Sequence, residues 1–311
     1  MIKVGLAGGR GYVGQELLGL LAGSPDYEVV YVGSRSSAGK TVTSEYPDSR
    51  CDLTFADLSS ESIQSCAADA WVIAQPNGKA DQFVQLFDES IRIIDISSDF
   101  RFDETWTYGL PELNQAAIQT NSRVANPGCY ATATQLALLP LINQVTGVPT
   151  AFGISGYSGA GRTPSDKNNP DRLANNILPY SLTDHTHERE VSRHLQRAVR
   201  FMPHVASFFR GITITVNVKM ADEIEETELL PLFEDYYKSF PLVQVTDSIP
   251  EIQQVAGTNR AVVGGFAVDP RDRRRVAIVS VIDNLRKGAA SQAVQNMNLM
   301  FGFPSEKGLV E

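Results

Sequence analysis

The sequence predicts an α/β protein, with a Rossmann-type doubly wound parallel sheet and a second α/β domain whose sheet is mainly antiparallel. Three observations support this fold class. Short apolar runs alternate with helical runs over residues 1–128. A glycine-rich turn joins the first strand pattern to the first helix pattern. Beyond residue 140, longer runs that alternate apolar and polar residues replace this pattern, and 311 residues suffice for two domains.

The first element is a short strand, in which Ile2, Val4 and Leu6 alternate with other residues. A G-x-G-x-x-G segment follows and leads into the helical run QELLGLLAG. Such glycines let backbone N–H groups approach a pyrophosphate, and the helix N-terminus adds partial positive charge. The alternative is a turn that binds no ligand. The residues assigned to a dinucleotide are Gly9, Arg10, Gly11, Tyr12, Val13 and Gly14.

The second strand, YEVVYVG at residues 27–33, leads into a loop that ends at Lys40. Proteins that prefer NAD usually carry an acidic residue here, which binds the ribose hydroxyls. This loop has none, and instead offers Ser34, Arg35 and Ser36, which suit a 2′-phosphate. We therefore expect NADP(H) as cofactor, against the alternative of an ordinary solvated loop.

Two more strand patterns, at residues 69–76 and 91–97, precede the segment VANPGC, and residues 78–90 read as a helix between them. Ligands of doubly wound sheets bind beyond the carboxyl ends of the strands. Loops beginning at Pro76, Ser97 and Asn126 each follow a strand, so we expect them to converge on a cofactor crevice.

Cys129 follows Pro-Gly and stands where a helix pattern begins. A helix N-terminus stabilises a thiolate, so this cysteine is a candidate nucleophile, although a free cysteine is most often a small buried hydrophobe. Cys51 and Cys66 lack such a setting. Three cysteines without metal-type spacing favour a reducing compartment and no metal site.

Residues after 140 predict the second domain. Strands are expected at 151–155, 212–220, 260–268 and 276–283, and helices at about 186–200 and 227–238. The arginines of residues 271–275 read as a solvated hairpin rather than a binding patch. A last helix, with Ala293, Val294, Met297 and Met300 at helical spacing, could return to the first domain. We therefore assign residues 1–128 and 285–311 to the first domain, and 129–284 to a catalytic, substrate-binding and oligomerisation domain.

The net charge of −9 excludes the broad basic face that a nucleic-acid-binding protein needs. No apolar run reaches the roughly 18 residues of a membrane helix, so no membrane partner is expected. The start MIKVGLAGG leaves no room for a signal peptide before the glycine motif. We expect a cytoplasmic protein that holds any anionic substrate with local cations.

Seven features carry a resemblance to a known family: GGRGYVGQELL, DISSDFR, YGLPELN, NPGCYATATQLAL, SGYSGAGR, the His185–His187 pair and DNLRKGAASQAVQNMNLMFG. Together they resemble the shorter form of N-acetyl-gamma-glutamyl-phosphate reductase, an arginine-biosynthesis family related to aspartate-semialdehyde dehydrogenase. The resemblance implies an NADP-dependent oxidoreductase that converts an acyl phosphate into an aldehyde through a cysteine thioester. It also implies a Rossmann domain completed by the C-terminal helix and a homo-oligomer, either a dimer or a tetramer.

The resemblance implies a role for each candidate site residue. Cys129 is the nucleophile, and a histidine, His187 or less favoured His185, is the acid/base. His204 is the next candidate, whereas His194 is not expected to act. Residues expected to bind the acyl-phosphate substrate are Ser98, Arg101, Arg162, Glu190 and Arg210. Further residues expected to bind the cofactor are Pro76, Ser158, Gly159, Asn284 and Lys287.

The segment around the histidines departs from the family's usual His-Arg-His-x-Pro-Glu-Ile, because Thr186 and Arg189 replace the arginine and the proline. Ala206 also stands where a proline is usual. A paralogue that acts on aspartyl or aminoadipyl phosphate is therefore an alternative, although Pro-Gly-Cys-Tyr and the histidine pair favour the acetylglutamyl substrate. The alternative from another class is a non-catalytic NADP-sensing Rossmann protein, which would leave the thiol and the histidine pair unexplained.

Overall fold

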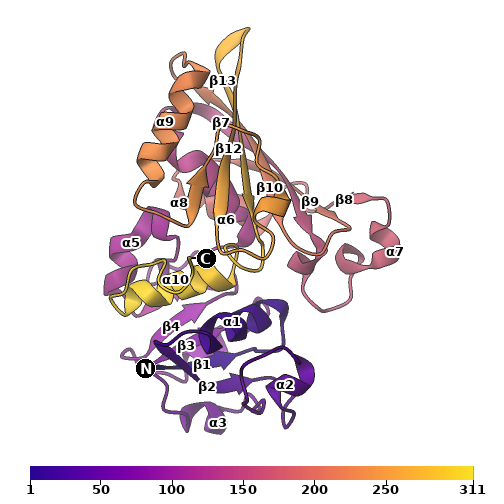
Figure 1. Cartoon of the computed structure of the whole chain (residues 1–311), viewed down its shortest axis with the longest axis vertical. Coiled ribbons are helices and arrows are strands. Elements are labelled where there is room, and N and C mark those ends of the chain that lie inside the picture. The colour runs from indigo at the N-terminus through magenta and orange to yellow at the C-terminus, as the bar shows by residue number, and fades with distance from the viewer. Residues whose placement is uncertain (311) are drawn as a thin grey trace. The chain divides into compact units, whose positions relative to one another are not determined.

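The computed structural model describes residues 1–310, which form two compact units (Figure 1). Unit 1 comprises residues 1–128 and 289–309, and unit 2 comprises residues 129–288 with Val310. The first boundary coincides with the expected one, whereas the second follows residue 288 rather than residue 284. Hydrogen bonds explain this difference, because the Asp283 carboxylate accepts from the amides of Leu285 and Arg286, and its carbonyl accepts from Gly288.

Unit 1 contains a parallel sheet of six strands in the order β2-β1-β3-β4-β6-β5. Every neighbouring pair is parallel, which confirms the predicted Rossmann-type sheet. The strands are β1 (Ile2–Ala7), β2 (Tyr27–Gly33), β3 (Ala70–Ile73), β4 (Arg92–Asp95), β5 (Thr107–Tyr108) and β6 (Arg123–Ala125).

The helices of unit 1 are α1 (Tyr12–Ala22), α2 (Val42–Glu45), α3 (Ser60–Gln64), α4 (Asp81–Val84), α5 (Pro111–Thr120) and α10 (Ala290–Met300). The C-terminal helix α10 packs against α1, α5 and β4, so the chain returns to its first unit as predicted. Every residue of α10 is buried. Its polar residues are anchored internally; for example, Gln292 and Asn296 both donate from their side-chain amides to the carbonyl of Gly109.

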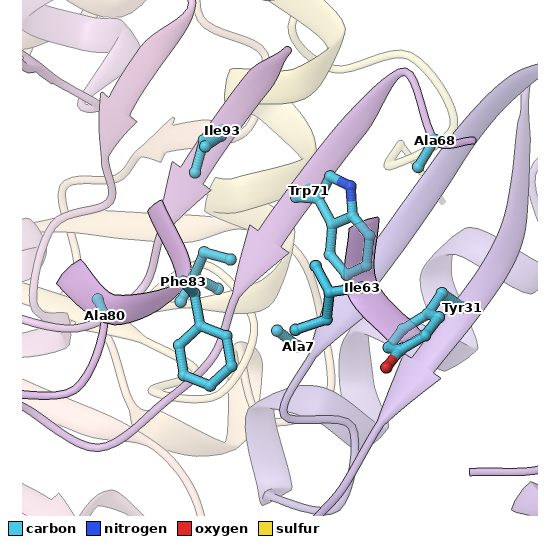
Figure 2. Close-up of a cluster of buried hydrophobic side chains, with 9 residues drawn as sticks. Ala7, Tyr31, Ile63, Ala68, Trp71, Ala80, Phe83 and Ile93 are labelled. Carbon is cyan, nitrogen blue, oxygen red and sulfur yellow. The ribbon is translucent and has the colours of Figure 1, made fainter. Parts of the chain in front are cut away.

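A cluster of apolar side chains fills one face of the unit 1 sheet (Figure 2). Trp71 of β3 lies at its centre, with its ring centroid 5.1 Å from that of Tyr31. A β-carbon on Gly5 would lie 2.6 Å from the Trp71 ring, so the neighbouring strand must be glycine there. Ile63 of α3 and Phe83 of α4 complete the cluster and cover this face.

The helix predicted over residues 78–90 is much shorter, because α4 spans only Asp81–Val84. After it, the amides of Leu86 and Phe87 bond to carbonyls three residues back, which is a tighter turn than an α-helix. Val84, Leu86 and Phe87 all pack on the Trp71 cluster. A regular helix cannot direct so many near-consecutive side chains to one face, so packing ends it early.

Unit 2 contains a mixed sheet of seven strands in the order β11-β12-β13-β10-β7-β9-β8. Only the pairs β7–β9 and β11–β12 are parallel, so the sheet is mainly antiparallel, as predicted. The strands are β7 (Val145–Gly156), β8 (Ile177–Pro179), β9 (Arg200–Ala206), β10 (Ile212–Met220), β11 (Val243–Val245), β12 (Ala261–Asp269) and β13 (Asp272–Ile282).

The helices of unit 2 are α6 (Cys129–Leu138), α7 (Pro170–Leu173), α8 (Thr186–His194) and α9 (Glu226–Tyr237). α6 packs against β10 and β13, and α9 packs against β11 and β12. On the sheet's other face, Phe152 of β7 is 40% exposed beside Met202 and Thr215, with which it is in register.

Two predictions in unit 2 have different outcomes. The helix expected to reach residue 200 ends at His194, because Gln196 adopts a left-handed backbone (φ 50°) and β9 begins at Arg200. The predicted arginine hairpin is confirmed, since Asp269 pairs with Asp272 across the β12–β13 turn. Arg271 and Arg275 form ion pairs with Asp269 there. Among residues 1–310, no helix is both long and apolar enough to cross a membrane.

Candidate active site

The glycine turn between β1 and α1 combines tight packing with one open position. A β-carbon on Gly14 would lie 2.5 Å from the Gly8 carbonyl oxygen, and one on Gly9 would lie 2.3 Å from Val32. Gly8 has a φ of +119° and lies against the carbonyl of Ala74. A β-carbon on Gly11 would meet no atom within 4 Å. Three glycines are therefore needed by the fold, whereas Gly11 borders open space.

Gly11 is also the N-cap of α1, which has no side-chain cap and no acidic residue in its first turn. The first amides of a helix point away from its body and carry partial positive charge. This end of α1 therefore has the chemistry that a pyrophosphate requires, and the chain fits a dinucleotide here. Arg10, whose Nε lies 3.9 Å from the Glu45 carboxylate, is beside the turn, and Tyr12 and Val13 begin the helix.

The loop after β2 divides its polar residues between two roles. The buried Ser34 hydroxyl accepts a hydrogen bond from the Ser37 amide at 3.2 Å, so it shapes the loop. Arg35 and Ser36 are exposed. Lys40 forms an ion pair with Glu45 at 2.6 Å. The Arg35 guanidinium and the Ser36 hydroxyl are thus the exposed polar groups at the start of this loop.

The loops that follow β3, β4 and β6 are hydrogen-bonded to one another, as neighbouring parallel strands lead us to expect. The Ser98 amide donates to the Asn77 side chain at 3.1 Å, near the exposed Pro76. Arg101 is only 7% exposed, and it donates to the carbonyls of Ile96 (2.8 Å) and Asn126 (2.9 Å). Arg101 therefore ties two loops together, a structural role that the sequence did not indicate.

Cys129 is the first residue of α6 and is partly buried. A β-carbon on Gly288 would lie 2.7 Å from the Cys129 β-carbon, so the segment DNLRKG runs directly against the thiol-bearing residue. Lys287, next to this glycine, is completely buried. Burial raises the pKa of the other two thiols, Cys51 and Cys66, which favours their protonated form.

A cluster of five rings surrounds the start of α6, and we call it the tyrosine–histidine cluster: Tyr130, Tyr180, His185, His187 and Phe201. Centroid distances are 4.9 Å for Tyr130–Phe201 and 6.0 Å for Tyr130–His187. His185 lies 4.8 Å from His187, 5.4 Å from Phe201 and 5.6 Å from Tyr180. Both predicted histidines thus share one cluster with the residue that follows Cys129.

The two tyrosine hydroxyls of the cluster are linked. Tyr130 donates to the carbonyl of His204, and its hydroxyl is also hydrogen-bonded to Tyr180. The two phenols therefore belong to one hydrogen-bonded chain that ends at the His204 carbonyl. Burial raises the pKa of both phenols, and a negative charge on Cys129 raises it further, so the thiol lies within electrostatic reach of both.

His185 is the N-cap of α8, and its Nδ1 accepts from the His187 amide at 3.0 Å. His187 lies in the first turn of α8, which begins at Thr186. Burial, together with the nearby charge of Lys167, lowers the pKa of His185 to about 4. A neutral, capping His185 leaves His187 as the better candidate for proton transfer at neutral pH.

Other predicted substrate residues lie around the same helix or farther along the chain. Glu190 is completely buried in α8, and its charge partly opposes the lowering of the His185 pKa. Arg210 lies 3.4 Å from the buried Asp283 carboxylate. Arg162 is exposed, in the loop that follows the 3₁₀ turn Tyr157–Ala160.

Three residues that we expected to bind the cofactor meet in unit 2. Asn284 donates to the Ser158 hydroxyl at 2.9 Å and accepts from the Gly211 amide at 2.7 Å. A β-carbon on Gly159 would lie 3.8 Å from the Asn284 amide nitrogen. The structure thus joins the glycine-rich turn after β7 to the segment after β13.

Sequence reasoning missed Tyr180, Phe201 and Lys167, which reach this region from separate segments. Tyr130 was also not predicted as a site residue, although it had a local signal because it follows Cys129 directly. Among residues 1–310, no group of three or more His, Cys, Asp or Glu side chains has the arrangement of a metal site.

Comparisons with known proteins bear on this arrangement. The family model described as "Semialdehyde dehydrogenase, NAD binding domain" matches residues 3–121, and "Semialdehyde dehydrogenase, dimerisation domain" matches residues 129–284. An N-acetyl-gamma-glutamyl-phosphate reductase of Xanthomonas campestris pv. campestris (strain B100) is 46% identical over 303 residues, which cover 96% of each chain. The chain belongs to the N-acetyl-gamma-glutamyl-phosphate reductase family.

Solved structures of aspartate-semialdehyde dehydrogenases are similar to this chain in fold. Aspartate-semialdehyde dehydrogenase II of Vibrio cholerae, complexed with ASA, has a TM-score of 0.79 at 19% identity, over 97% of this chain and 98% of that one. The enzyme of Candida albicans, solved with NADP, has a TM-score of 0.78 at 15% identity, over 97% and 98%. These likenesses show that the chain shares the two-domain α/β fold of these dehydrogenases.

Proposed function

We propose that the protein catalyses the NADPH-dependent reductive dephosphorylation of N-acetyl-gamma-glutamyl phosphate to N-acetylglutamate semialdehyde, a step of arginine biosynthesis. The observation that carries this proposal is Cys129 at the start of α6, bordered by Gly288 and by the tyrosine–histidine cluster. A nucleotide-sensing protein has no need of such a thiol. The 46% identical relative named for this activity supports the choice of acyl chain.

The cofactor is assigned to the glycine turn and the loop after β2. The first amides of α1 bind the pyrophosphate beside Gly11, and exposed Arg35 and Ser36 bind the 2′-phosphate. When bound here, NADPH would supply a hydride to a thioester on Cys129, and His187 as the imidazolium would supply the proton that completes the thiohemiacetal. The absence of an acidic residue from residues 34–40 supports NADP(H) over NAD(H).

The acyl-transfer step belongs to Cys129. Its thiolate attacks the carbonyl carbon of the acyl phosphate, the C–S bond forms, and the C–O bond to phosphate breaks with its electron pair leaving on inorganic phosphate. The N-terminus of α6 stabilises the thiolate by its partial positive charge. Arg101 is assigned to the departing phosphate, in addition to its two carbonyl contacts.

Proton transfer is assigned to His187. When the thiohemiacetal collapses, its hydroxyl proton passes to the His187 imidazole, the C–S bond breaks, and the sulfur regains its electron pair as the aldehyde leaves. His185 orients this residue, because its Nδ1 holds the His187 amide and its lowered pKa keeps the ring neutral. Glu188 fixes the same helix to β9 through a 2.8 Å hydrogen bond from the Phe201 amide.

The exposed face of the unit 2 sheet supports a homo-oligomer, either a dimer or a tetramer. Phe152, which is 40% exposed, lies in register with Met202 and Thr215 on this face. A second copy of the chain would bury these side chains. Phe152→Asp should therefore lower the mass measured by light scattering after size-exclusion chromatography, whereas an unchanged mass would place the contact elsewhere.

We assign the enzyme to the reducing cytoplasm, where Cys129 stays a thiol.

The reaction is tested most directly in reverse. Purified protein is given NADP⁺, inorganic phosphate and one of three aldehydes: N-acetylglutamate, aspartate or aminoadipate semialdehyde. We expect phosphate-dependent NADPH formation, with the highest kcat/KM for the N-acetylglutamate compound. A preference for either other aldehyde would change the assigned substrate, and no turnover of any of them would refute the assignment as an enzyme.

A further inference from the structure

Lys167 lies beside the tyrosine–histidine cluster, in the short 3₁₀ turn Asp166–Asn168. Its Nζ is 4.7 Å from the centroid of the Tyr180 ring, and the side chain is half-buried. The same charge acts on His185, whose ring is 5.6 Å from that of Tyr180. The ammonium is thus held at one side of the cluster by an aromatic face.

Three other cations of unit 2 differ from Lys167 because each is paired with an acid. Arg172 lies 4.0 Å from Asp166, Arg189 lies 3.4 Å from Asp184, and Arg210 lies 3.4 Å from Asp283. Within residues 1–310, no carboxylate lies within 4.0 Å of the Lys167 ammonium. A half-buried positive charge that faces rings instead of an acid is suited to an anion that arrives from solution.

Tyr180 links Lys167 to the reacting thiol. One face of its ring carries the ammonium, while its hydroxyl is hydrogen-bonded to Tyr130, the neighbour of Cys129. The charge of Cys129 also acts on the Tyr180 phenol. Lys167 is therefore separated from the Cys129 sulfur by about the length of one tyrosine side chain. The departing phosphate is bonded to the carbon that this sulfur attacks, so it lies too close to Cys129 to be the group that Lys167 binds.

We infer that Lys167 binds the carboxylate at the far end of the substrate's acyl chain and selects for substrates that carry it. This inference rests on the proposed function, because an N-acetylglutamyl chain has a carboxylate at the α-carbon, three carbons from the reacting one. The anion lies over the ring edge of Tyr180, against the ammonium, while the acyl carbon reaches Cys129. Lys167 is thereby a specificity-determining residue rather than a member of the proton-transfer machinery.

The test compares two aldehydes that differ only in this carboxylate, N-acetylglutamate semialdehyde and 4-acetamidobutanal, in the phosphate-dependent reduction of NADP⁺. Lys167→Met removes the charge and keeps most of the side-chain volume, and Lys167→Arg keeps the charge. We expect Lys167→Met to raise KM for the carboxylated aldehyde by about 10-fold to 100-fold, with kcat changed less than about 3-fold. The kcat/KM for 4-acetamidobutanal should stay within about 3-fold, and Lys167→Arg should recover most of the loss.

Arg172→Ala is the matched control, because Arg172 is an exposed cation of the same segment that pairs with Asp166. It should leave both aldehydes unaffected. Equal losses on both aldehydes for Lys167→Met, or no loss on either, would overturn the assignment of Lys167. Wild-type turnover of N-acetylglutamate semialdehyde decides the proposed function separately, and its absence would overturn both.

Discussion

The glycine turn of unit 1 is one continuous segment, residues 8–14, whereas the tyrosine–histidine cluster of unit 2 draws its rings from α6, the segment before α8, α8 itself and β9. The glycine turn offers backbone amides and open space to a ligand. Its packed glycines exclude side chains, because a β-carbon added to one of them would lie as close as 2.1 Å to a neighbouring atom. The cluster works through buried side chains whose pKa values are set by their neighbours. Substitutions that add atoms to the glycine turn should therefore weaken cofactor binding, whereas substitutions that remove functional groups near the cluster should lower the rate of catalysis.

The largest effect is expected at Cys129, the proposed nucleophile of unit 2. Cys129→Ser should reduce turnover by at least about 10³-fold, because a serine hydroxyl without a strong base is a far weaker nucleophile. Binding of NADPH, measured by fluorescence titration, should stay within a factor of about 3. Near-wild-type turnover in this variant would remove the thioester from the mechanism.

The second prediction separates the two histidines of the cluster. His187→Asn should lower kcat by about 10²-fold to 10⁴-fold in both directions and remove a limb of the pH–rate profile near neutrality. His185→Asn should have a smaller effect on kcat, because asparagine can also cap α8. If only the His185 variant loses the limb, the two roles are exchanged, and if both keep it, His204 is the next residue to test.

The third prediction concerns the packed glycines of unit 1. Gly14→Ala should destabilise the protein by about 1–3 kcal/mol, because its β-carbon would lie 2.5 Å from the Gly8 carbonyl oxygen. Gly19→Ala is the control in the same helix, since its β-carbon would meet no atom within 4 Å. Alanine has the better helix propensity, so this control should gain about 0.5–1 kcal/mol. Urea unfolding of both variants measures the contrast, and equal changes would contradict it.

The fourth prediction is a smaller effect on cofactor choice. Arg35→Ala should reduce the ratio of kcat/KM for NADPH to that for NADH by about 10-fold, because one charge-assisted contact to the 2′-phosphate is lost. The NADH value itself should change little. A wild-type enzyme that uses both cofactors equally well would show that the loop after β2 does not bind a phosphate.

The smallest effect is a pH dependence of stability. Burial lowers the pKa of His185 to about 4 in the folded protein from an ordinary 6.5, so between pH 6.5 and pH 4 only the unfolded chain takes up the proton. The free energy of unfolding should therefore fall as the pH is lowered through this window. Asp95, whose pKa burial raises to about 6, acts in the opposite direction.

The matched measurement for this last effect is the Tm of the wild type and of His185→Asn between pH 4 and pH 7. Asp95 contributes equally to both proteins, so the difference between the two curves isolates His185. The variant should lose less stability on acidification. Parallel curves would mean that the imidazole titrates alike in both states.

Local signals determined much of the fold. The alternation of β10 predicted Ile212–Met220 with both ends correct, and the apolar spacing of Ala293, Val294, Met297 and Met300 predicted α10. These patterns depend only on which side of an element is buried, so a window of ten residues contains them. The G-x-G-x-x-G motif is local as well, because its residues are contiguous in the chain.

Only the tertiary structure decided which residues gather around Cys129. Tyr180, His185 and Phe201 become neighbours because β8 and β9 pair and α8 packs beside α6, contacts that no local pattern records. The role of Arg101 as a tie between two loops and the lowered pKa of His185 arise in the same way. Burial and electrostatic environment are sums over groups that are distant in the chain, whereas residue type and spacing are properties of the chain itself. The sequence thus determined the fold class and the glycine turn and made Cys129 the proposed nucleophile, whereas tertiary packing determined how the charges around it are held.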